Sequence, residues 1–530
     1  MTNEHAETLI QEAAPAGAQH ERGRILKPVR VGICGLGTVG GGTFNVLTRN
    51  ADDISRRAGR PIVIEQVAHR SIHPDCDITG IKATTDVFEV ANNPDVDVLV
   101  ELIGGYDIAR ELVLTAIANG KHVVTANKAL IAVHGNEIFR AAHEKGVIVA
   151  FEAAVAGGIP VIKSLREGLG ANRIEWVAGI INGTGNFILT HMRDEGRAFE
   201  DVLAEAQALG YAEADPTFDV EGIDAAHKLT ILASIAYGVP LQFEKAFTEG
   251  ISRITAEDVE QADNLGYVIK HLGISKRTDQ GLELRVHPTL IPKERLLANV
   301  HGVKNAIAVM GDAVGPTLYY GAGAGAEPTA SAVVADLLDV ARDIATDHHY
   351  RVPYLAFSGI DEDVSQLPIM PMEEITTAYY LRLLAVDRPG VLARVATILA
   401  EQGISIEALI QKEATEGELV PIILLTHRTK EKQMNEAIRE IEAMADIAGP
   451  RHAISRGKPG RGRVTDALYQ HAWASARALF RRGSAHRHGQ RRRSLRSGNA
   501  ARILQRGAGQ HGRALLRRDR LSGDEAVRQR

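Results

Sequence analysis

The sequence has few cysteines and no long apolar run. Its 530 residues include only two cysteines, Cys34 and Cys76, too few for a disulfide framework or a four-cysteine metal site. No run of about 18 apolar residues is present, so no segment is expected to span a membrane. The first 28 residues are polar and lack the apolar core of a secretory signal. These absences favour a cytoplasmic enzyme built from several domains.

Charge is distributed unevenly along the chain. The formal net charge is −5, but residues 451–530 hold 21 basic and four acidic residues, whereas residues 1–450 hold 40 and 62. A basic tail can bind nucleic acid. This tail lacks interleaved aromatic residues and any recognisable binding module, so we predict no nucleic-acid partner.

The order of apolar and helical patterns divides the chain into domains. After a flexible leader at 1–28, strands and helices alternate over 29–158, which predicts an α/β domain with a Rossmann-type doubly wound parallel sheet. Residues 159–350 mix helices with alternating strands, an α+β domain whose last long helix is expected to close back onto the first domain. A linker at 351–375 precedes residues 376–450, which read βαββα, one strand short of a ferredoxin-like unit.

A glycine-rich turn follows the first predicted strand. Gly35, Gly37 and Gly40 fit the pattern G-x-G-x-x-G, with Thr38 and Val39 between them. The glycines permit a tight turn and close approach of the backbone to a pyrophosphate at the helix N-terminus. The alternative is a purely structural glycine turn.

The end of the second strand bears on cofactor choice. An enzyme that uses NAD usually places an acid there for the ribose 2′-hydroxyl. The residues here are Ala68-His69-Arg70-Ser71, and Arg70 could pair with a 2′-phosphate, which favours NADP over NAD. The alternative is that Arg70 is a solvated loop charge.

Residues 210–228 gather carboxylates around one lysine. Asp224 and Lys228 are four positions apart at the head of a helix and share a face. They predict either a surface ion pair or a general-acid lysine held by a carboxylate. Glu213 and Asp219 lie upstream, free to face a bound ammonium group. Lys128 follows the fourth strand, where open sheets bind ligands, although it could equally be a solvated lysine at a helix start.

Two further turns are candidate binding loops. Residues 152–159 offer backbone carbonyls and one carboxylate, which suit a hard cation, with a plain turn as the alternative. Gly390 would leave free backbone N–H groups near a helix start in the third unit, where a small carboxylate could bind. The alternative is again a plain turn.

With these motifs in place, the chain resembles the homoserine dehydrogenase family from Val29 to the linker, and the third unit resembles an ACT domain. No aspartate kinase domain precedes the match, so the fused bifunctional type is not expected. The family signature is matched at ten positions: Ala206, Gly210, Tyr211, Asp215, Pro216, Asp219, Val220, Gly222, Asp224 and Lys228.

The resemblance implies NAD(P)-dependent interconversion of L-homoserine and L-aspartate 4-semialdehyde, on the route to threonine, isoleucine and methionine. It also implies threonine as the ACT effector and a homodimer or homotetramer formed through the 159–350 catalytic and dimerisation domain. The implied roles are a proton donor, Lys228; substrate contacts, Asp224, Glu213, Asp219 and Lys128; cofactor contacts, Lys128, Gly210, Glu213 and Gly325; and a sodium site, Glu152, Val155, Gly157 and Ile159.

The basic tail departs from the ACT pattern. A legal codon choice for residues 466–474, read in the next frame, begins Met-Arg-Tyr-Ile-Ser-Thr-Arg-Gly, which resembles the start of threonine synthase. Our hypothesis is that residues 451–530 are translated out of frame after a frameshift near Pro450 and have no evolved fold. The ACT sheet would then lack its last strand, and an unpaired edge invites mispairing.

Two other functions remain open at this point. One is another Rossmann oxidoreductase acting on an amino-acid semialdehyde, although the lack of a catalytic cysteine motif argues against the phosphorylating kind. The other is an amino-acid-sensing regulator built on the ACT domain, which leaves the acidic stretch at 210–228 unexplained.

Overall fold

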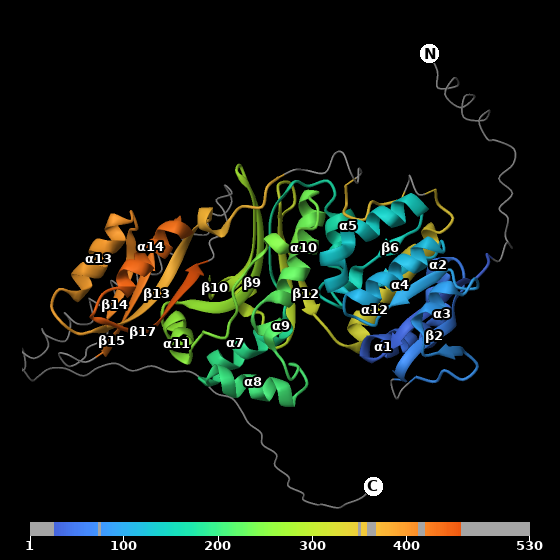
Figure 1. The fold of residues 1–530 in the computed structure, drawn as a ribbon, viewed down its shortest axis with the longest axis horizontal. Helices are drawn as coiled ribbons and strands as arrows, with labels where there is room; N and C mark the ends of the chain where they lie inside the picture. The colour runs from blue at the N-terminus through green and yellow to red at the C-terminus, as the bar shows by residue number, and fades with distance from the viewer. Residues whose placement is uncertain (1–25, 73–75, 348–350, 358–366, 412–418, 457–530) are drawn as a thin grey trace, which may run out of the picture. The chain divides into compact units, whose positions relative to one another are not determined.

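The structure is a computed structural model that describes residues 26–72, 76–347, 351–357, 367–411 and 419–456 (Figure 1). The predicted leader, up to residue 25, and the basic tail from residue 457 lie outside these residues. No helix among the described residues is long and apolar enough to cross a membrane.

The N-terminal domain is built on a six-stranded parallel sheet in the order β3-β2-β1-β4-β5-β6. Its central strands are buried almost throughout, which explains their near-continuous apolar sequence. The strands are β1 (Val29–Leu36), β2 (Ile62–Ile72), β3 (Lys82–Thr84), β4 (Val98–Glu101), β5 (His122–Thr125) and β6 (Val149–Ala150). The helices are α1 (Thr38–Arg49), α2 (Ala51–Ala58), α3 (Val87–Asn92), α4 (Asp107–Ala118) and α5 (Lys128–Lys145).

A helix from much later in the chain completes this domain. α12 (Ala326–Asp343) packs on α1 and α2, and its Val333 and Leu337 belong to the same apolar cluster as the first strands (Figure 1). The contact is close: a Cβ on Gly42 would stand 2.5 Å from the carbonyl oxygen of Ala326. The prediction that this helix closes back onto the first domain is confirmed.

The second domain is an α+β layer whose strands run in the order β12-β11-β7-β9-β10. α10, which carries Asp224 and Lys228, is buried along nearly its whole length, between this sheet and α5. The strands are β7 (Ile174–Ile180), β8 (Phe247–Thr248), β9 (Tyr267–Thr278), β10 (Gly281–Pro292), β11 (Lys304–Gly311) and β12 (Gly315–Ala322). The helices are η1 (Glu152–Ala154), α6 (Val161–Lys163), η2 (Ser164–Gly168), α7 (Gly183–Glu195), α8 (Phe199–Ala208), α9 (Thr217–Val220), α10 (Ile223–Tyr237), η3 (Phe243–Lys245), α11 (Ala256–Asn264) and η4 (Leu296–Asn299).

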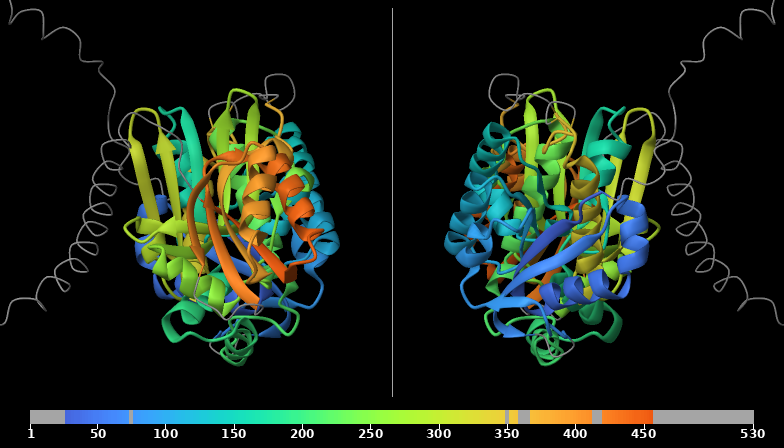
Figure 2. Two further views of the ribbon diagram at one scale, coloured as in Figure 1. Left: turned by 90° about the vertical axis from the view of Figure 1, so that its left-hand side faces the viewer. Right: turned by 90° about the vertical axis from the view of Figure 1, so that its right-hand side faces the viewer.

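The third unit carries two helices, α13 and α14, which pack side by side over its strands (Figure 2). Its strands pair in the order β17-β13-β15-β14. The elements are η6 (Met372–Glu374), β13 (Thr376–Val386), α13 (Val391–Glu401), β14 (Ile406–Gln411), β15 (Leu419–Thr426), β16 (Thr429–Lys430), α14 (Glu431–Glu442) and β17 (Ile447–Arg456).

The prediction that this sheet lacks its last strand is wrong. β17 runs through the proposed frameshift point at Pro450 and pairs antiparallel with β13, which makes the order βαββαβ. Ladder hydrogen bonds use main-chain groups that every residue except proline carries. Pro450 falls where the register between β17 and β13 shifts, a position that tolerates a missing N–H. Ile454 beyond it is buried, so an Arg-rich segment still supplies a usable strand.

Candidate active site

The glycine turn has the geometry of a nucleotide-binding loop. Gly35 has φ +100°, a left-handed value that favours glycine. A Cβ on Gly40 would lie 1.8 Å from the carbonyl oxygen of Gly35, so the helix can approach the strand only without a side chain there. A Cβ on Gly37 would meet nothing within 4 Å. Gly37 is therefore free of structural demands and faces open space.

The N-terminus of α1 fits a pyrophosphate. α1 begins at Thr38 after the cap residue Gly37, no side chain caps it, and its first turn holds no acid. The first N–H groups, including those of Thr38 and Val39, have no partner within the helix, and the helix dipole favours an anion there. Because glycine at 37 leaves the approach clear, these residues fit the phosphates of a dinucleotide.

Arg70 lies near the end of β2 with an exposed side chain. β2 is the neighbour of β1, so Arg70 stands at the same carboxyl edge of the sheet as the glycine turn. Gly325, another predicted cofactor contact, caps α12 with φ +123° next to the contact between Ala326 and α1.

A buried carboxylate at the end of β4 was missed by the sequence analysis. Glu101 is fully buried and accepts hydrogen bonds from the N–H groups of Ile103 and Gly104, both at 3.0 Å, and from Thr125 Oγ1 at 2.6 Å. Burial raises the pKa of Glu101, and these donors oppose the rise. The carboxylate thus ties the loop after β4 to the end of β5, directly before Lys128. The sequence signal that could have located Glu101 is a single acidic residue at the end of an apolar strand.

Asp224 joins the two predicted lysines. Its Oδ2 accepts from Lys228 Nζ at 2.7 Å, and its Oδ1 lies 3.1 Å from Lys128 Nζ. Lys228 is well buried, with 11% of its side chain exposed, whereas Lys128 is 36% exposed. Lys228 Nζ also donates to the carbonyl oxygen of Ile181 at 2.7 Å. This arrangement does not fit the two alternatives given above, in which Lys128 is a solvated lysine and Asp224 and Lys228 form a surface ion pair.

The charged groups in this cluster shift one another's pKa values. Burial alone would raise the pKa of Asp224, but the ammonium groups of Lys228 and Lys128 hold that pKa well below its usual range. Asp224 raises the pKa of Lys128 despite burial, and Asp219 and Glu213 add to the effect. Asp224 is therefore an anion and Lys128 a cation near neutral pH.

Asn182 is a second residue that sequence reasoning missed. Its Nδ2 donates to Asp219 Oδ1 at 2.8 Å and to Asp224 Oδ2 at 2.9 Å, and its Oδ1 caps α7 by accepting from Gly185 N. Burial and the neighbouring Asp224 raise the pKa of Asp219, which Asn182 opposes. The sequence Asn-Gly-Thr-Gly at a strand end was a helix-cap signal that could have located it.

Glu213 and Gly210 lie on the exposed rim of this cluster. The Glu213 side chain is exposed, yet it is near enough to Lys128 to contribute to the raised pKa of that lysine. Gly210 follows α8 with φ +74°, and a Cβ there would meet nothing within 4 Å. Both residues are exposed, so a ligand can reach them.

His227, whose sequence position suggests either a packing or a surface residue rather than a metal ligand, is fully buried beside Lys228. Its ring lies 4.1 Å from that of Phe243 and 5.4 Å from that of Phe218, centroid to centroid, and its Nε2 is 3.4 Å from the hydroxyl of Tyr106. Burial lowers the pKa of His227 to about 4, so the ring is neutral. This aromatic contact supports the packing interpretation.

The predicted sodium loop combines an engaged carboxylate with turned backbone. Both carboxylate oxygens of Glu152 accept N–H groups at the start of α6, from Ile162 and Lys163. Its side chain is thus occupied, and no cluster of three acidic, histidine or cysteine side chains suited to a metal is found among the described residues. Ala156 and Gly157 both have positive φ, 56° and 49°. For Ala156 this costs about 1 kcal/mol, so the loop is held in an unusual conformation that redirects its carbonyls. With the Glu152 carboxylate engaged and the Ile159 carbonyl accepting from Val161 N at 2.8 Å, the carbonyls of Val155 and Gly157 are the predicted ligands that accept no hydrogen bond among the described residues.

Comparison with known proteins agrees with these features. Residues 160–338 match the homoserine dehydrogenase family, residues 35–152 match the homoserine dehydrogenase NAD-binding domain, and residues 379–446 match the ACT domain. A homoserine dehydrogenase of Pseudomonas aeruginosa is 69% identical over 426 residues, which cover 80% of this chain and 98% of that protein.

Solved structures give the same result. The crystal structure of a homoserine dehydrogenase from Thiobacillus denitrificans is 63% identical with a TM-score of 0.78, covering 82% of this chain and all of that one. A hyperthermophilic archaeal homoserine dehydrogenase in complex with NADPH is 27% identical with a TM-score of 0.51, covering 59% of this chain and 97% of that one. From the nucleotide loop, the lysine–aspartate cluster and these matches together, we conclude that the chain belongs to the homoserine dehydrogenase family.

Proposed function

We propose that the cluster around Asp224 is where this NAD(P)-dependent oxidoreductase interconverts L-aspartate 4-semialdehyde and L-homoserine, with Lys228 as the proton donor. One observation carries the assignment of Lys228. An ammonium group has three N–H donors, and Lys228 uses two of them on Asp224 and on the Ile181 carbonyl. Within the described part of the chain no partner is found for the third, which is left for a substrate oxygen.

The chemistry requires a proton at that oxygen. When bound, the nicotinamide ring supplies the hydride that reduces the aldehyde carbon. Negative charge then grows on the substrate oxygen, and Lys228 gives it a proton while Lys128 adds a second positive charge nearby. Asp224 holds both lysines through its two oxygens, so their separation is set before substrate arrives.

We propose that Asp219 and Glu213 bind the substrate's ammonium group. Both carboxylates lie near Lys128, and Asp219 is partly buried with a raised pKa. An ammonium group would stabilise this partly buried negative charge more strongly than water does. Asn182 fixes the direction of the Asp219 carboxylate through its hydrogen bond.

We propose NADP as the preferred cofactor. The support is Arg70, an exposed cation at the end of β2 where an acid would favour NAD, and the NADPH named for the archaeal relative.

The loop at 152–159 is proposed to hold a sodium ion with main-chain carbonyls. Its left-handed Ala156 is the feature that supports this.

We also propose regulation and assembly. Gly390 has φ +94° at the head of α13 with open space around its Cα, which suits the carboxylate of threonine as an ACT effector.

β12 is the outer strand of its sheet and exposes 58% of Tyr320, which supports a homodimer or homotetramer through the second domain. A cytoplasmic location stays a prediction.

Replacing Lys228 tests the central proposal. We expect Lys228→Ala to lower kcat about 100-fold or more, because it removes the general acid, while the Kd for NADPH stays unchanged. The kcat is measured by stopped-flow or steady-state oxidation of NADPH with L-aspartate 4-semialdehyde. The Kd for NADPH is measured by fluorescence titration. Lys304→Ala, an exposed lysine on β11, is the matched control. Near-normal turnover in Lys228→Ala would overturn the role.

A further inference from the structure

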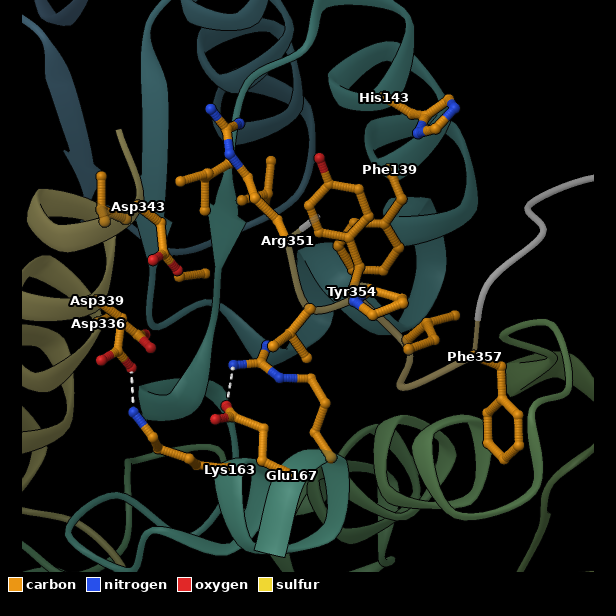
Figure 3. Close-up of a pocket in the computed structure, with 18 of the residues that line it drawn as sticks. Phe139, His143, Lys163, Glu167, Asp336, Asp339, Asp343, Arg351, Tyr354 and Phe357 are labelled. Atoms are coloured by element: carbon orange, nitrogen blue, oxygen red, sulfur yellow. Dashed lines mark hydrogen bonds and ion pairs between the residues drawn. The ribbon is translucent and has the colours of Figure 1, made fainter. Parts of the chain in front are cut away.

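A cavity of about 740 Å³ lies apart from the Asp224 cluster and has no part in the chemistry above. Its walls come from α5, β6, η2, α12 and residues 351–357, here called the strap (Figure 3). The volume is in the range that small-molecule sites occupy.

One wall carries positive charge that the protein does not fully satisfy. The Arg166 side chain is only 12% exposed and pairs with Glu167 through Nη2 at 3.2 Å. Its Nε is buried and has no hydrogen-bond partner among the described residues. A buried guanidinium donor without an acceptor is costly, so an anionic group in the cavity would be stabilised here, and a carboxylate matches the shape of a guanidinium.

α12 supplies negative charge. Asp336, Asp339 and Asp343 lie along it and line one side of the cavity (Figure 3). Asp339 is already paired with Lys163. Asp343 is half-buried, and burial together with Asp339 raises its pKa, although the charges of Arg351 and Lys163 oppose the rise. A further cation beside Asp343 would favour its ionised form.

The opposite side of the cavity is aromatic. The rings of Phe139 and Tyr354 stack 5.1 Å apart with an angle of 7° between their planes (Figure 3). Tyr354 is fixed because its hydroxyl donates to the Val147 carbonyl, and Arg351 anchors the strap to the Gly146 carbonyl at 2.9 Å. Phe139 is buried between Phe151 and Tyr354, so the partly exposed Tyr354 ring supplies the apolar surface on this side, which suits an aromatic or large aliphatic group.

The charge balance narrows the class of ligand. The lining holds four acidic and five basic side chains in addition to His143. A nucleotide or another polyanion would meet several aspartates, and a polyamine would meet several arginines, so both are disfavoured. A molecule with one charge of each sign and an apolar group satisfies every side of the cavity.

We propose that this cavity binds a free α-amino acid with an aromatic or large aliphatic side chain. Its carboxylate pairs with Arg166, its ammonium group with Asp343, and its side chain lies against Tyr354. The site is separate from the proposed substrate site and from the ACT turn at Gly390. Since the proposal concerns binding alone, it stands or falls independently of the roles given to Lys228 and Asp224.

Calorimetric titration of the full-length protein tests it. L-phenylalanine and L-leucine are expected to bind. Phenethylamine, which lacks the carboxylate, and 3-phenylpropionate, which lacks the ammonium group, are expected to bind at least about tenfold more weakly, because the first leaves Arg166 and the second leaves Asp343 without its ligand partner. Saturating NADPH and homoserine should leave the affinity for L-phenylalanine unchanged. Absence of binding by both amino acids, or displacement by homoserine, overturns the proposal.

Variants locate the site. Arg166→Gln and Asp343→Asn should each weaken L-phenylalanine binding about tenfold. Asp343→Asn is the safer of the two for folding, because its side chain is only half-buried. Arg388→Ala, in the turn before Gly390, is the matched control and should leave binding unchanged. If Arg388→Ala abolishes binding while Asp343→Asn does not, the amino acid sits in the ACT domain and the cavity is not its site.

Discussion

At the scale of single residues, the active site depends on hydrogen bonds that aim its charges. Asn182 is the best example, because one amide group donates to both Asp219 and Asp224 while its oxygen caps α7. Its side-chain partners are the two carboxylates and the α7 N-terminus rather than the proposed proton donor Lys228, so we regard it as a positioning residue. Its loss should change where the carboxylates point more than whether the protein folds.

We expect Asn182→Ala to raise the KM for homoserine about tenfold. Asn182 lowers the pKa of Asp219, so the variant's Asp219 should take up its proton at a higher pH than in the wild type. Because the ionised carboxylate binds the ammonium group, the rise in KM on acidification should begin at a higher pH. Steady-state kinetics from pH 9 down to the lowest pH at which both proteins stay folded measure this. Asn299→Ala, a surface asparagine, is the control, and coincident pH profiles would contradict the role.

Arg70 gives a second test at this scale. If it pairs with the 2′-phosphate, Arg70→Ser should raise the KM for NADPH about tenfold and leave the KM for NADH unchanged. Arg56→Ser, an exposed arginine on α2, should change neither. Equal effects on both cofactors, or no effect, would exclude Arg70 as the selective contact.

At the scale of elements, one turn joins strand, glycines and helix into a binding loop. Gly40 is required by the fold, because its Cβ would collide with the Gly35 carbonyl, whereas Gly37 has φ −73° and open space around it. No contact within the chain requires glycine at position 37. The close approach of a pyrophosphate would require it, because a side chain there would stand in the way.

We therefore expect Gly37→Ala to fold with wild-type stability and to bind NADPH at least about tenfold more weakly. Gly40→Ala should instead lose stability, since its Cβ would meet backbone. Thermal unfolding without cofactor and fluorescence titration with NADPH separate the two effects. A Gly37→Ala protein with unchanged affinity would show that the phosphates pass elsewhere.

At the scale of the whole molecule, β17 links two domains through one sheet. It pairs with β13 along most of its length and with the end of β10 in parallel, at Thr289 and Leu290. The Arg382 guanidinium on β13 reinforces the link by donating from Nε to Asp258 Oδ1 at 2.6 Å. Ser455 Oγ lies 2.8 Å from His287 Nδ1 across the same junction.

This junction should weaken in acid. Burial lowers the pKa of His287 to about 3, with Arg285 adding to the effect, while an unfolded histidine titrates near 6.5. Between these values the unfolded chain binds more protons, so stability should fall as the pH decreases below about 6.5. Urea unfolding at pH 7.5 and 5 should show a smaller decrease for His287→Gln than for the wild type. His134→Gln, on α5, is the control; equal decreases would exclude His287 as a contributor.

Local chemistry explains how much the sequence alone determined. The parallel sheet, the glycine turn and the pairing of Asp224 with Lys228 follow from periodicity, turn residues and spacing within short segments, and the family follows from the resemblance of the signature at residues 206–228. Tertiary packing decided the rest. Only the fold brings Lys128 to the second oxygen of Asp224, places Asn182 between two carboxylates, buries Glu101 under Thr125, and recruits residues 451–456 into β17. Such contacts join residues far apart in the chain, and their energy comes from burial and from hydrogen bonds that exist only once the domains have packed.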